Sequence, residues 1–338
     1  MVLAAGLGTR LRPVTYEVPK PMVPVANRPV LEHLLRLLRG HELGEVIANL
    51  HWFPETIRGP IGDGSALGVD LTYIEESELT GTAGGVRAAR EFLTAEGGSF
   101  VVMAGDALTD VDLRGLLDAH ARNGGVATLG VKRVTNVSEY GVIVTGADDR
   151  IQGFQEKPDP AEALSDLVNC MIYAFDGEVF DYFPDSEFVD FANDVFPALL
   201  DHDVPFHVHR IDRYWNDVGS IGEYVQGNLD AVAGHVEVEV GGEVVEGEAD
   251  PDAPGSGGLG AAQAGLPAGT EVNGRVLVGE SVTVAGGVRF DGNVVIGPGA
   301  RIGRGAMVKE SVLLPGAEVP DGGLVVGGIA GRKGAVAG

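Results

Sequence analysis

The sequence predicts an α/β protein with two folded regions, a mostly parallel sheet covered by helices and then a parallel β-helix. Short apolar runs alternate with helical patterns over the first two-thirds of the 338 residues. A six-residue apolar period starts near residue 266, after a stretch rich in acidic residues and glycine. We therefore expect one domain at 1–233, an acidic flexible linker at 234–264 and a hexapeptide-repeat domain at 265–330.

Apolar runs of strand length and amphipathic helical patterns follow one another along the first domain. Strands are expected at Val2–Ala5, Val46–Leu50, Leu71–Ile74, Phe100–Ala104, Val126–Val131, Gly141–Val144 and Leu167–Phe175. A helix opens at Pro29 with Leu31, Leu34, Leu35 and Leu38 on one face, and further helices are expected at Gly84–Leu93, Val111–Ala121, Phe191–Leu200 and Ile221–Val232. Such alternation predicts a Rossmann-like, mostly parallel mixed sheet with helices on both faces.

The C-terminal region repeats apolar residues with a period of six. One row contains nine residues, namely Leu266, Val272, Val278, Val284, Phe290, Ile296, Ile302, Val308 and Leu314. A second row lies two positions before most of them, at Thr270, Val276, Val282, Val288, Val294, Ala300, Ala306 and Val312. Hexapeptide repeats of this kind build left-handed parallel β-helices, here with about three coils. The alternative, glycine-rich disorder, would not space aliphatic residues so regularly.

The chain is strongly acidic. Asp and Glu total 49 against 24 for Lys and Arg, which gives a formal net charge of −25. Such a field repels nucleic acid, whose binding needs a basic surface, so we expect no nucleic-acid partner. One hypothesis is a salt-rich cytoplasm, in which an acidic surface is screened and stays soluble. The alternative is an acidic protein without that adaptation.

Neither a membrane span nor a disulfide framework is predicted. No run of about 18 apolar residues occurs, and the start lacks the basic and apolar regions of a secretory signal. The single cysteine, Cys170, cannot form an internal disulfide, and we interpret it as a small buried hydrophobic residue. These features favour a cytoplasmic protein.

A glycine-rich turn follows the first strand. Glycines after a strand let the backbone approach phosphates, which suits Gly6 and Gly8, and Arg10 adds a fixed positive fork. The glycine-rich turn alone is weak evidence for phosphate binding. It lacks the G-K-[ST] ending of a Walker A loop, and Leu11 stands where a dinucleotide fingerprint has its third glycine. Lys20 follows between Pro19 and Pro21, so we expect it to be exposed outside a helix interior, and the alternative is an ordinary solvated lysine.

Two acidic residues are candidate metal ligands. Asp106 ends a buried strand run, and ligand sites of open parallel sheets lie at the carboxyl ends of strands. Asp217 lies in RYWNDVGSIGEY. Carboxylate oxygens suit a hard cation such as Mg²⁺. The alternative for each is a structural role, a strand-end turn or helix cap at Asp106 and a cap before the helix at Asp217.

The segment from Gly6 to His33, GLGTRLRPVTYEVPKPMVPVANRPVLEH, closely resembles the opening of sugar-1-phosphate nucleotidyltransferases. The resemblance covers residues 1 to about 233, and longer members of that family carry a hexapeptide tail. It implies transfer of a nucleotidyl group from an NTP to a sugar 1-phosphate, with Mg²⁺ and release of pyrophosphate. Asp106 and Asp217 match the two metal-binding aspartates of the family.

The resemblance also implies roles for other residues. Arg10, Lys20 and Lys157 match the catalytic residues. The nucleotide-binding set is Leu3, Ala5, Gly6, Gly8, Thr9, Arg10, Glu75, Gly81, Thr82 and Asp106. The sugar-phosphate-binding set is Gly141, Glu156, Lys157 and Asn169. We expect Pro158 to keep Lys157 extended, and the alternative for Glu156 and Lys157 is an exposed ion pair.

The sequence predicts the identity of the substrates less specifically than it predicts the reaction. Guanine offers adjacent donors that suit a carboxylate such as Glu75 or Glu76, with Gly81 packed on the base, which favours GTP. Several stretches also look most like mannose-1-phosphate guanylyltransferases, and the alternative is a glucose-1-phosphate thymidylyl- or uridylyltransferase. Met171 stands where the family has glycine, and we expect it to add bulk near the sugar.

Two other functions compete with this one. An acetyltransferase in the β-helix would need a histidine base, and no histidine follows His235. A non-catalytic regulatory or scaffold subunit would usually have lost the phosphate loop or the metal acids. We also expect a homo-oligomer, with the β-helix as its contact or as an allosteric element.

Overall fold

The computed structural model describes residues 1–16, 18–247, 266–332 and 334–337. The chain forms two compact units. The first comprises Met1–Leu7, Glu17–Met22 and Leu34–Trp215, and the second comprises Gly8–Tyr16, Val23–His33 and Asn216–Gly338. This division differs from the expected boundary at 233, because helix α7 (Ile221–Ala233) packs against strands of the repeat region.

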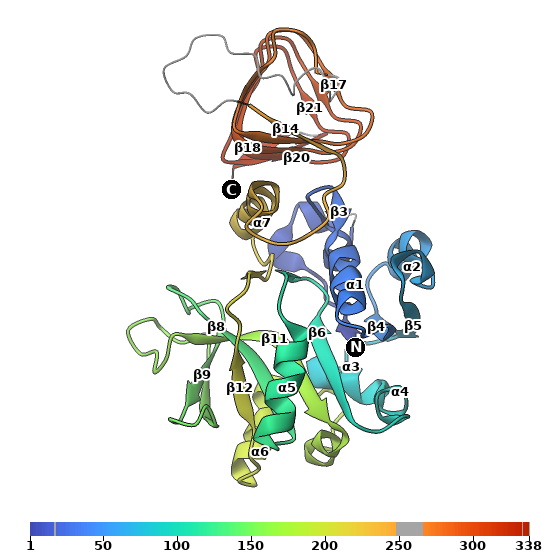
Figure 1. The fold of residues 1–338 in the computed structure, drawn as a ribbon, viewed down its shortest axis with the longest axis vertical. Helices are drawn as coiled ribbons and strands as arrows, with labels where there is room; N and C mark the ends of the chain where they lie inside the picture. The colour runs from blue at the N-terminus through green and yellow to red at the C-terminus, as the bar shows by residue number, and fades with distance from the viewer. Residues whose placement is uncertain (17, 248–265, 333, 338) are drawn as a thin grey trace. The chain divides into compact units, whose positions relative to one another are not determined.

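A nine-stranded sheet forms the framework of the first unit (Figure 1). Its strands are β1 (Val2–Leu3), β4 (Glu45–Leu50), β5 (Asp70–Glu75), β6 (Ser99–Ala104), β8 (Ala127–Arg133), β9 (Gly141–Thr145), β10 (Ile151–Glu156), β11 (Leu167–Asp176) and β12 (His207–Arg210). The order is β10–β9–β11–β6–β1–β4–β5, and β8 pairs with β11 and β12. β1 runs parallel to β4 and β6, whereas β11 runs antiparallel to β6 and β8. The predicted mixed sheet is confirmed, although neither β10 nor β12 was predicted.

The helices mostly follow the apolar pattern. In α1 (Val30–Gly40) the four predicted leucines are at most 2% exposed. The expected helix at 84–93 is two helices, α3 (Thr82–Ala88) and α4 (Arg90–Thr94). The others in the first unit are α2 (Pro54–Ile61), which was not predicted, α5 (Leu113–Asn123), and a π-helical turn (Phe191–Val195) that leads into α6 (Phe196–Asp201). Among the described residues, no helix has the length and apolar character needed to cross a membrane.

Alternate side chains of β8 show that both faces of the sheet are covered. Thr128 lies on one face, where its hydroxyl is 3.0 Å from Nδ1 of His120 in α5. Leu129, next along the strand, belongs to the core cluster on the other face, which includes Phe191 and Phe196. Because successive residues of a strand point to opposite faces, α5 and the α6 region lie on opposite sides. The prediction of helices on both faces is confirmed.

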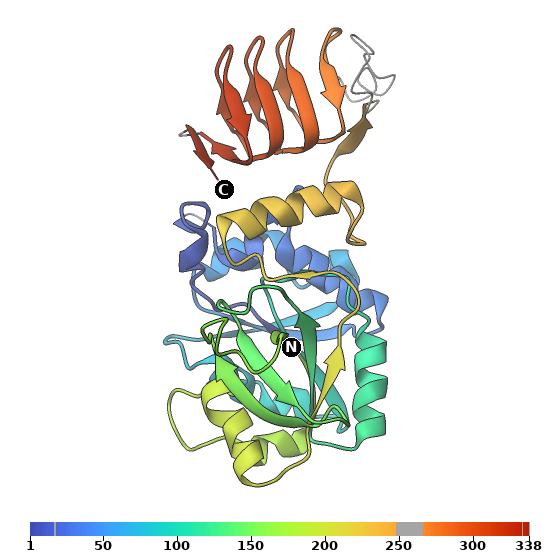
Figure 2. The same ribbon diagram turned by 90° about the vertical axis from the view of Figure 1, so that its left-hand side faces the viewer.

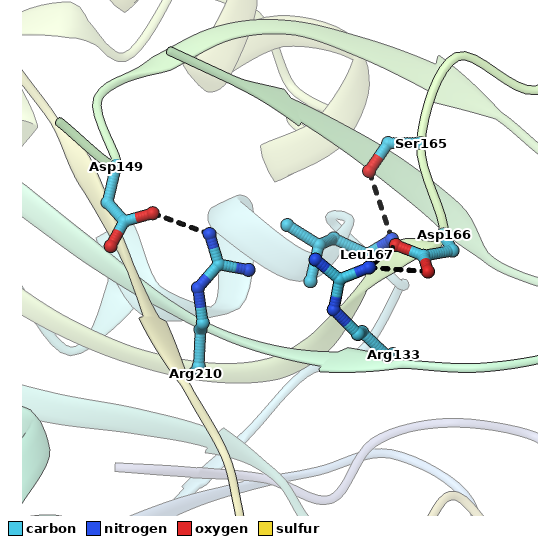
Figure 3. A network of polar contacts seen from close by, with 6 residues as sticks. All are labelled: Arg133, Asp149, Ser165, Asp166, Leu167 and Arg210. Carbon is cyan, nitrogen blue, oxygen red and sulfur yellow. Dashed lines mark hydrogen bonds and ion pairs between the residues drawn. The ribbon is translucent and has the colours of Figure 1, made fainter. Parts of the chain in front are cut away.

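Exposed ion pairs hold the ends of two parallel strands (Figure 3). Arg133, the last residue of β8, lies 2.5 Å from Asp166, and Arg210, the last residue of β12, lies 2.6 Å from Asp149. The amide of Leu167 also donates to the hydroxyl of Ser165. Exposed pairs of this kind contribute about 0–1 kcal/mol each and are screened by salt. Arg133 and Arg210, at the ends of β8 and β12, thus each have an acidic partner.

The second unit contains stacked coils of short parallel strands (Figure 2). Its strands are β2 (Pro24–Val25), β3 (Arg28–Pro29), β14 (Glu243–Glu246), β15 (Glu271–Asn273), β16 (Arg275–Val278), β17 (Thr283–Val284), β18 (Arg289–Ile296), β19 (Arg301–Ile302), β20 (Met307–Leu313), β21 (Glu318–Val319), β22 (Leu324–Val326), β23 (Gly328–Gly331) and β24 (Gly334–Ala337). Glu271 pairs with Arg289, and Arg289 with Met307, so the first coils advance 18 residues, or three hexads. The repeats therefore form a parallel β-helix, as predicted.

The later coils are a residue shorter than the hexad pattern predicts, since Met307 pairs with Leu324 and Val312 with Ile329. Ile296 pairs with Leu313, so the expected continuation of the apolar row at Leu314 is wrong. The register shifts because Glu310 alone lies opposite residues 292 and 293. Gly292 has a φ of 67°, the left-handed conformation that favours glycine, and the carboxylate of Glu310 lies over it in the neighbouring coil.

Part of the expected linker is ordered structure. β14 pairs antiparallel with β16 of the β-helix, so the expectation of a flexible segment is wrong for residues 243–246. Val245 is only 2% exposed, whereas Glu243 and Glu246 are exposed, so the strand buries an apolar side chain despite its acidic residues. Residues 248–264 of the expected linker lie outside the described residues.

Candidate active site

An ion pair joins two of the predicted site residues at the end of β6. The ammonium of Lys20 lies 2.7 Å from Oδ2 of Asp106, which follows the strand. A Cβ on Gly105 would lie 2.7 Å from the carbonyl oxygen of Leu3, so glycine allows β6 to end close to β1. The side chain of Lys20 is only 10% exposed, so the expected exposure is wrong. The carboxylate compensates the desolvation of the ammonium.

The start of the phosphate turn belongs to the first unit. Leu3 ends β1, Ala5 is 6% exposed and Gly6 is exposed. A Cβ on Gly6 would meet no atom within 4 Å, so the backbone there faces open space. Gly6 thus has the access that a phosphate-binding backbone needs.

The rest of the turn belongs to the second unit. Gly8 has a φ of 59°, the left-handed conformation that favours glycine, and it precedes a 3-10 helix over Thr9–Leu11. The hydroxyl of Thr15 donates to the carbonyl oxygen of Gly8 at 2.7 Å and fixes the turn. Thr9 and Arg10 are exposed, which suits groups that are to meet an anionic substrate.

The predicted base-binding loop is attached to a distant part of the first unit. Gly81 has a φ of 88°, and a Cβ there would lie 2.3 Å from the carbonyl oxygen of Val189. The hydroxyl of Thr82 donates to Asp190 at 2.8 Å. The close approach to the backbone of Val189 therefore explains the glycine, and its packing on a base stays a prediction. Glu75, at the end of β5, is exposed and lies 2.8 Å from Arg58.

Three of the predicted sugar-contacting residues meet on neighbouring strands. Gly141 and Glu156 are paired across β9 and β10, and a Cβ on Gly141 would lie 3.2 Å from Oε2 of Glu156 and 4.0 Å from Cβ of Asn169. The amide of Asn169 donates to the hydroxyl of Tyr173 at 2.8 Å. Burial raises the pKa of Tyr173, so this hydroxyl keeps its proton. The sheet thus brings these three residues together, and their contact with the sugar stays a prediction.

Lys157 adopts an unexpected backbone conformation. Its φ is 45°, so the prediction of an extended residue is wrong. Its amide donates to the carbonyl oxygen of Tyr140 at 3.0 Å, which closes the end of the β9–β10 pairing and holds the left-handed residue in place. Its ammonium lies 3.7 Å from Glu156, with both side chains about half exposed, which is the weak surface pair named as the alternative.

Met171 also has a positive φ, of 53°, in the bulge of β11. This conformation explains why glycine would suit the position. The side chain packs against the core cluster of the first unit that contains Tyr173 and Phe191, and its nearness to the sugar stays a prediction. Cys170 is buried, as predicted.

Asp217 lies in the turn before α7, in the second unit. The hydroxyl of Ser220 accepts from the amide of Glu223 at 3.2 Å and caps the helix, so Asp217 is not the cap. Val218 has a φ of 46°, which a β-branched residue rarely adopts, and it is 1% exposed. The side chain of Asn216 fixes this turn, since its oxygen accepts from the amide of Val218 and its amide donates to the carbonyl of Glu223.

The described residues contain no group of three or more histidine, cysteine or acidic side chains that could hold a metal ion. Mg²⁺ usually binds through one or two carboxylates together with waters and substrate phosphates, so a dedicated cage is not required. The carboxylate of Asp106 is 32% exposed, and its donor type fits a hard cation.

The sequence analysis missed Asn49 as a site-region residue and did not settle between Glu75 and Glu76. Asn49 lies near the end of β4 and donates to the buried carboxylate of Glu76 at 2.5 Å. A polar residue near the end of an apolar strand run was the available signal, the same signal that identified Asp106.

Comparisons with known proteins support the same family. A family model described as nucleotidyl transferase matches residues 1–233. A UTP–glucose-1-phosphate uridylyltransferase of Synechocystis sp. is 36% identical over 339 residues, which cover 95% of this chain and 85% of the relative. A mannose-1-phosphate guanylyltransferase of Mycobacterium tuberculosis is 33% identical over 323 residues, which cover 95% of this chain and 81% of the relative.

Solved structures show the same fold. HddC from Yersinia pseudotuberculosis has a TM-score of 0.59 at 23% identity, covering 67% of this chain and 96% of its own. A putative glucose-1-phosphate thymidylyltransferase from Bacillus anthracis has a TM-score of 0.61 at 22% identity, covering 71% of this chain and 96% of its own. From the family model and the two relatives, the chain belongs to the nucleotidyl transferase family, as a sugar-1-phosphate nucleotidyltransferase.

Proposed function

We propose that the chain transfers a guanylyl group from GTP to mannose 1-phosphate and releases pyrophosphate. The observation that supports nucleotidyl transfer is the Lys20–Asp106 pair, a buried ammonium against a carboxylate at the end of a strand. The choice of GTP and mannose 1-phosphate is supported by the guanylyltransferase of Mycobacterium tuberculosis at 33% identity. Thymidylyl or uridylyl transfer to glucose 1-phosphate is the second candidate. The uridylyltransferase of Synechocystis sp., at 36% identity, favours it.

The chemistry is an in-line attack by a phosphate oxygen of the sugar 1-phosphate on the α-phosphorus of the nucleotide. Such transfers depend on positioning and on neutralising charge, so no covalent enzyme intermediate is required. Lys20 and Arg10 would hold the leaving pyrophosphate. Lys157 would orient the attacking phosphate and offset the repulsion between two anions. Glu156 and Asn169 would contact the sugar from adjoining strands.

Asp106 and Asp217 are the proposed ligands of a divalent cation, with Mg²⁺ as the expected metal. When bound, the cation would neutralise charge on the phosphates. One oxygen of the Asp106 carboxylate accepts a hydrogen bond from Lys20, so the lysine fixes the orientation of the other oxygen. At Asp217, the turn fixed by Asn216 carries the carboxylate.

One experiment tests the reaction and its substrates together. Purified protein is assayed for pyrophosphate release with four NTPs against mannose, glucose, galactose and N-acetylglucosamine 1-phosphates. GTP with mannose 1-phosphate should give the highest kcat/KM. If none of the substrate pairs gives pyrophosphate release, the proposed enzymatic activity is refuted and the non-catalytic scaffold subunit is favoured. A clear preference for UTP or dTTP with glucose 1-phosphate would favour the second candidate.

The metal assignment needs a separate test. Asp106→Ala should abolish turnover and weaken the binding of Mn²⁺. Electron paramagnetic resonance in the presence of the nucleotide measures that binding. Asp118→Ala, an exposed acid of α5, is the control and should change neither. Full activity of a folded Asp106→Ala protein would refute the assignment. The homo-oligomer remains a proposal, and light scattering after size-exclusion chromatography would measure its mass.

A further inference from the structure

Two polar side chains of β11 meet across the bulge in that strand. The side-chain amide of Asn169 donates to the hydroxyl of Tyr173 at 2.8 Å. In a regular strand, residues four positions apart lie on one face but about 13 Å from each other. Here Asn169 pairs with Val131 and Tyr173 with Leu129, so residues four apart on β11 face residues only two apart on β8. The bulge therefore shortens the strand enough to bring the amide and the hydroxyl together.

The packing of the Tyr173 ring fixes the position of its hydroxyl. The residue is 1% exposed, and its backbone pairs with β6 on one side and with β8 on the other. The ring packs against three phenylalanine rings at centroid distances of 5.3 to 5.5 Å, namely those of Phe175, Phe191 and Phe196. Close packing on several sides restricts a side chain to one position. The hydroxyl is thus a fixed partner for Asn169.

The backbone of the bulge sets which way the Asn169 amide faces. Oδ1 of Asn169 accepts from the backbone amide of Met171 at 2.9 Å. A backbone N–H can only donate, so Oδ1 has to face Met171 and Nδ2 has to face Tyr173. The hydroxyl of Tyr173 is therefore the acceptor in its bond with Asn169. The two bonds together hold the amide group in one orientation.

The oriented amide keeps one N–H for a substrate. Nδ2 carries two hydrogens, and among the described residues the side chain of Asn169 has only Tyr173 and Met171 as hydrogen-bond partners. Asn169 is half-buried, so a ligand can reach it. Its Cβ and Oε2 of Glu156 border the same space over Gly141. A sugar hydroxyl both donates and accepts, which matches a carboxylate that accepts beside an amide that donates.

We infer that Tyr173 is a positioning residue that orients the side-chain amide of Asn169 for the sugar 1-phosphate. The inference rests on the proposed function, in which Asn169 contacts the sugar. Tyr173 is buried, so it acts through Asn169 rather than on the substrate. Without the hydroxyl, Nδ2 of Asn169 faces an apolar ring, and the amide turns away to find another partner. The predicted nucleotide-binding residues lie on other segments, so binding of the nucleotide should not depend on this hydroxyl.

The test uses Tyr173→Phe, which removes the hydroxyl and keeps the packed ring. KM and kcat for pyrophosphate release are measured with the sugar 1-phosphate and the nucleotide that the wild type prefers. We expect the sugar-phosphate KM to rise about three- to tenfold, as for the loss of one hydrogen bond, and the nucleotide KM to change less than about twofold. Hydrogen exchange without substrate should also become faster at the amide of Met171, because the side chain of Asn169 no longer holds it.

A double-mutant cycle shows whether Tyr173 acts through Asn169. Asn169→Ala should raise the sugar-phosphate KM at least as much as Tyr173→Phe does. Adding Tyr173→Phe to Asn169→Ala should change that KM by less than about twofold, because the hydroxyl then has no amide to orient. Equal effects of Tyr173→Phe in the wild-type and Asn169→Ala backgrounds would overturn the inference.

Tyr224→Phe is the matched control. Tyr224 is also buried, and its hydroxyl donates to the carbonyl oxygen of Pro24 at 2.8 Å in the second unit. Both variants should melt at a lower temperature, but Tyr224→Phe should keep the wild-type sugar-phosphate KM. The inference fails if Tyr173→Phe also changes only the melting temperature, or if it raises the nucleotide KM by the same factor. An inactive wild type would instead refute the proposed function, and the inference with it.

Discussion

Arg275 of β16 joins the β-helix to the end of α7, and its removal should destabilise the second unit. Its Nη1 donates to the carbonyl oxygens of Val232 at 3.0 Å and Ala233 at 2.8 Å. The last carbonyls of a helix lack partners within the helix, and a positive charge there is also favoured by the helix dipole. Its Nε donates to Glu246 of β14 at 2.8 Å, so one side chain ties α7 to two strands.

The size of the effect follows from these contacts. A hydrogen bond from a charged donor contributes about 1.5–3 kcal/mol, and water can replace part of it because the side chain is 40% exposed. We therefore expect Arg275→Ala to lower the free energy of unfolding by about 2 kcal/mol. Arg301→Ala is the control, since Arg301 is 74% exposed and has an ion pair with Glu318 at 3.3 Å. It should cost at most about 1 kcal/mol.

Urea unfolding followed by circular dichroism measures both variants, and hydrogen exchange with mass spectrometry locates the change. Faster exchange in Arg275→Ala should begin at the C-terminal end of α7. It should reach the turn around Asp217 only if the whole helix loosens. Equal urea midpoints for Arg275→Ala and Arg301→Ala, with unchanged exchange in α7, would refute the reasoning.

Three further predictions concern the loops, the histidines and the surface. Gly81→Ala should lower the melting temperature sharply, because its Cβ would lie 2.3 Å from a backbone oxygen at a φ of 88°. Gly6→Ala, with open space around it, should melt like the wild type and raise the nucleotide KM, and equal melting of the two variants would contradict this. Burial lowers the pKa of His207 below its usual value of 6.5. Below that pH the unfolded chain therefore binds more protons than the folded chain, and the free energy of unfolding should fall as the pH drops from about 6.5. A His207→Gln protein with the same pH slope would count against this. If the net charge of −25 reflects a salt-rich cytoplasm, the melting temperature should rise from 0.1 M to molar KCl, and equal stability would favour the plain acidic protein.

Local sequence patterns predicted the core elements well. The leucines of α1 are buried as their spacing requires, and the six-residue period produced first coils of three hexads. The same patterns failed where backbone geometry depends on distant contacts. The coil that shortens at Glu310 has an unbroken hexad pattern in the sequence, and only the neighbouring coil shows that one residue opposes two.

The candidate site divides in a similar way. The glycine turn, Asp106 and the E-K-P motif could be identified from residue types and their positions after strands. The burial of Lys20 could not, because it depends on a carboxylate 86 positions away. The left-handed conformations of Lys157 and Met171 also escaped prediction, since both depend on bonds from other parts of the sheet or its bulge.

By itself, the sequence determined most of the core strands and helices, the family and the residue types of the site, because apolar periodicity and short motifs are local properties of the chain. Tertiary structure alone decided which polar groups meet. Asn49 and Glu76 are 27 positions apart, and no local pattern pairs them. They meet because β4 and β5 lie side by side in parallel. The buried amide of Asn49 needs a hydrogen-bond acceptor, and Glu76, directly after β5, provides it.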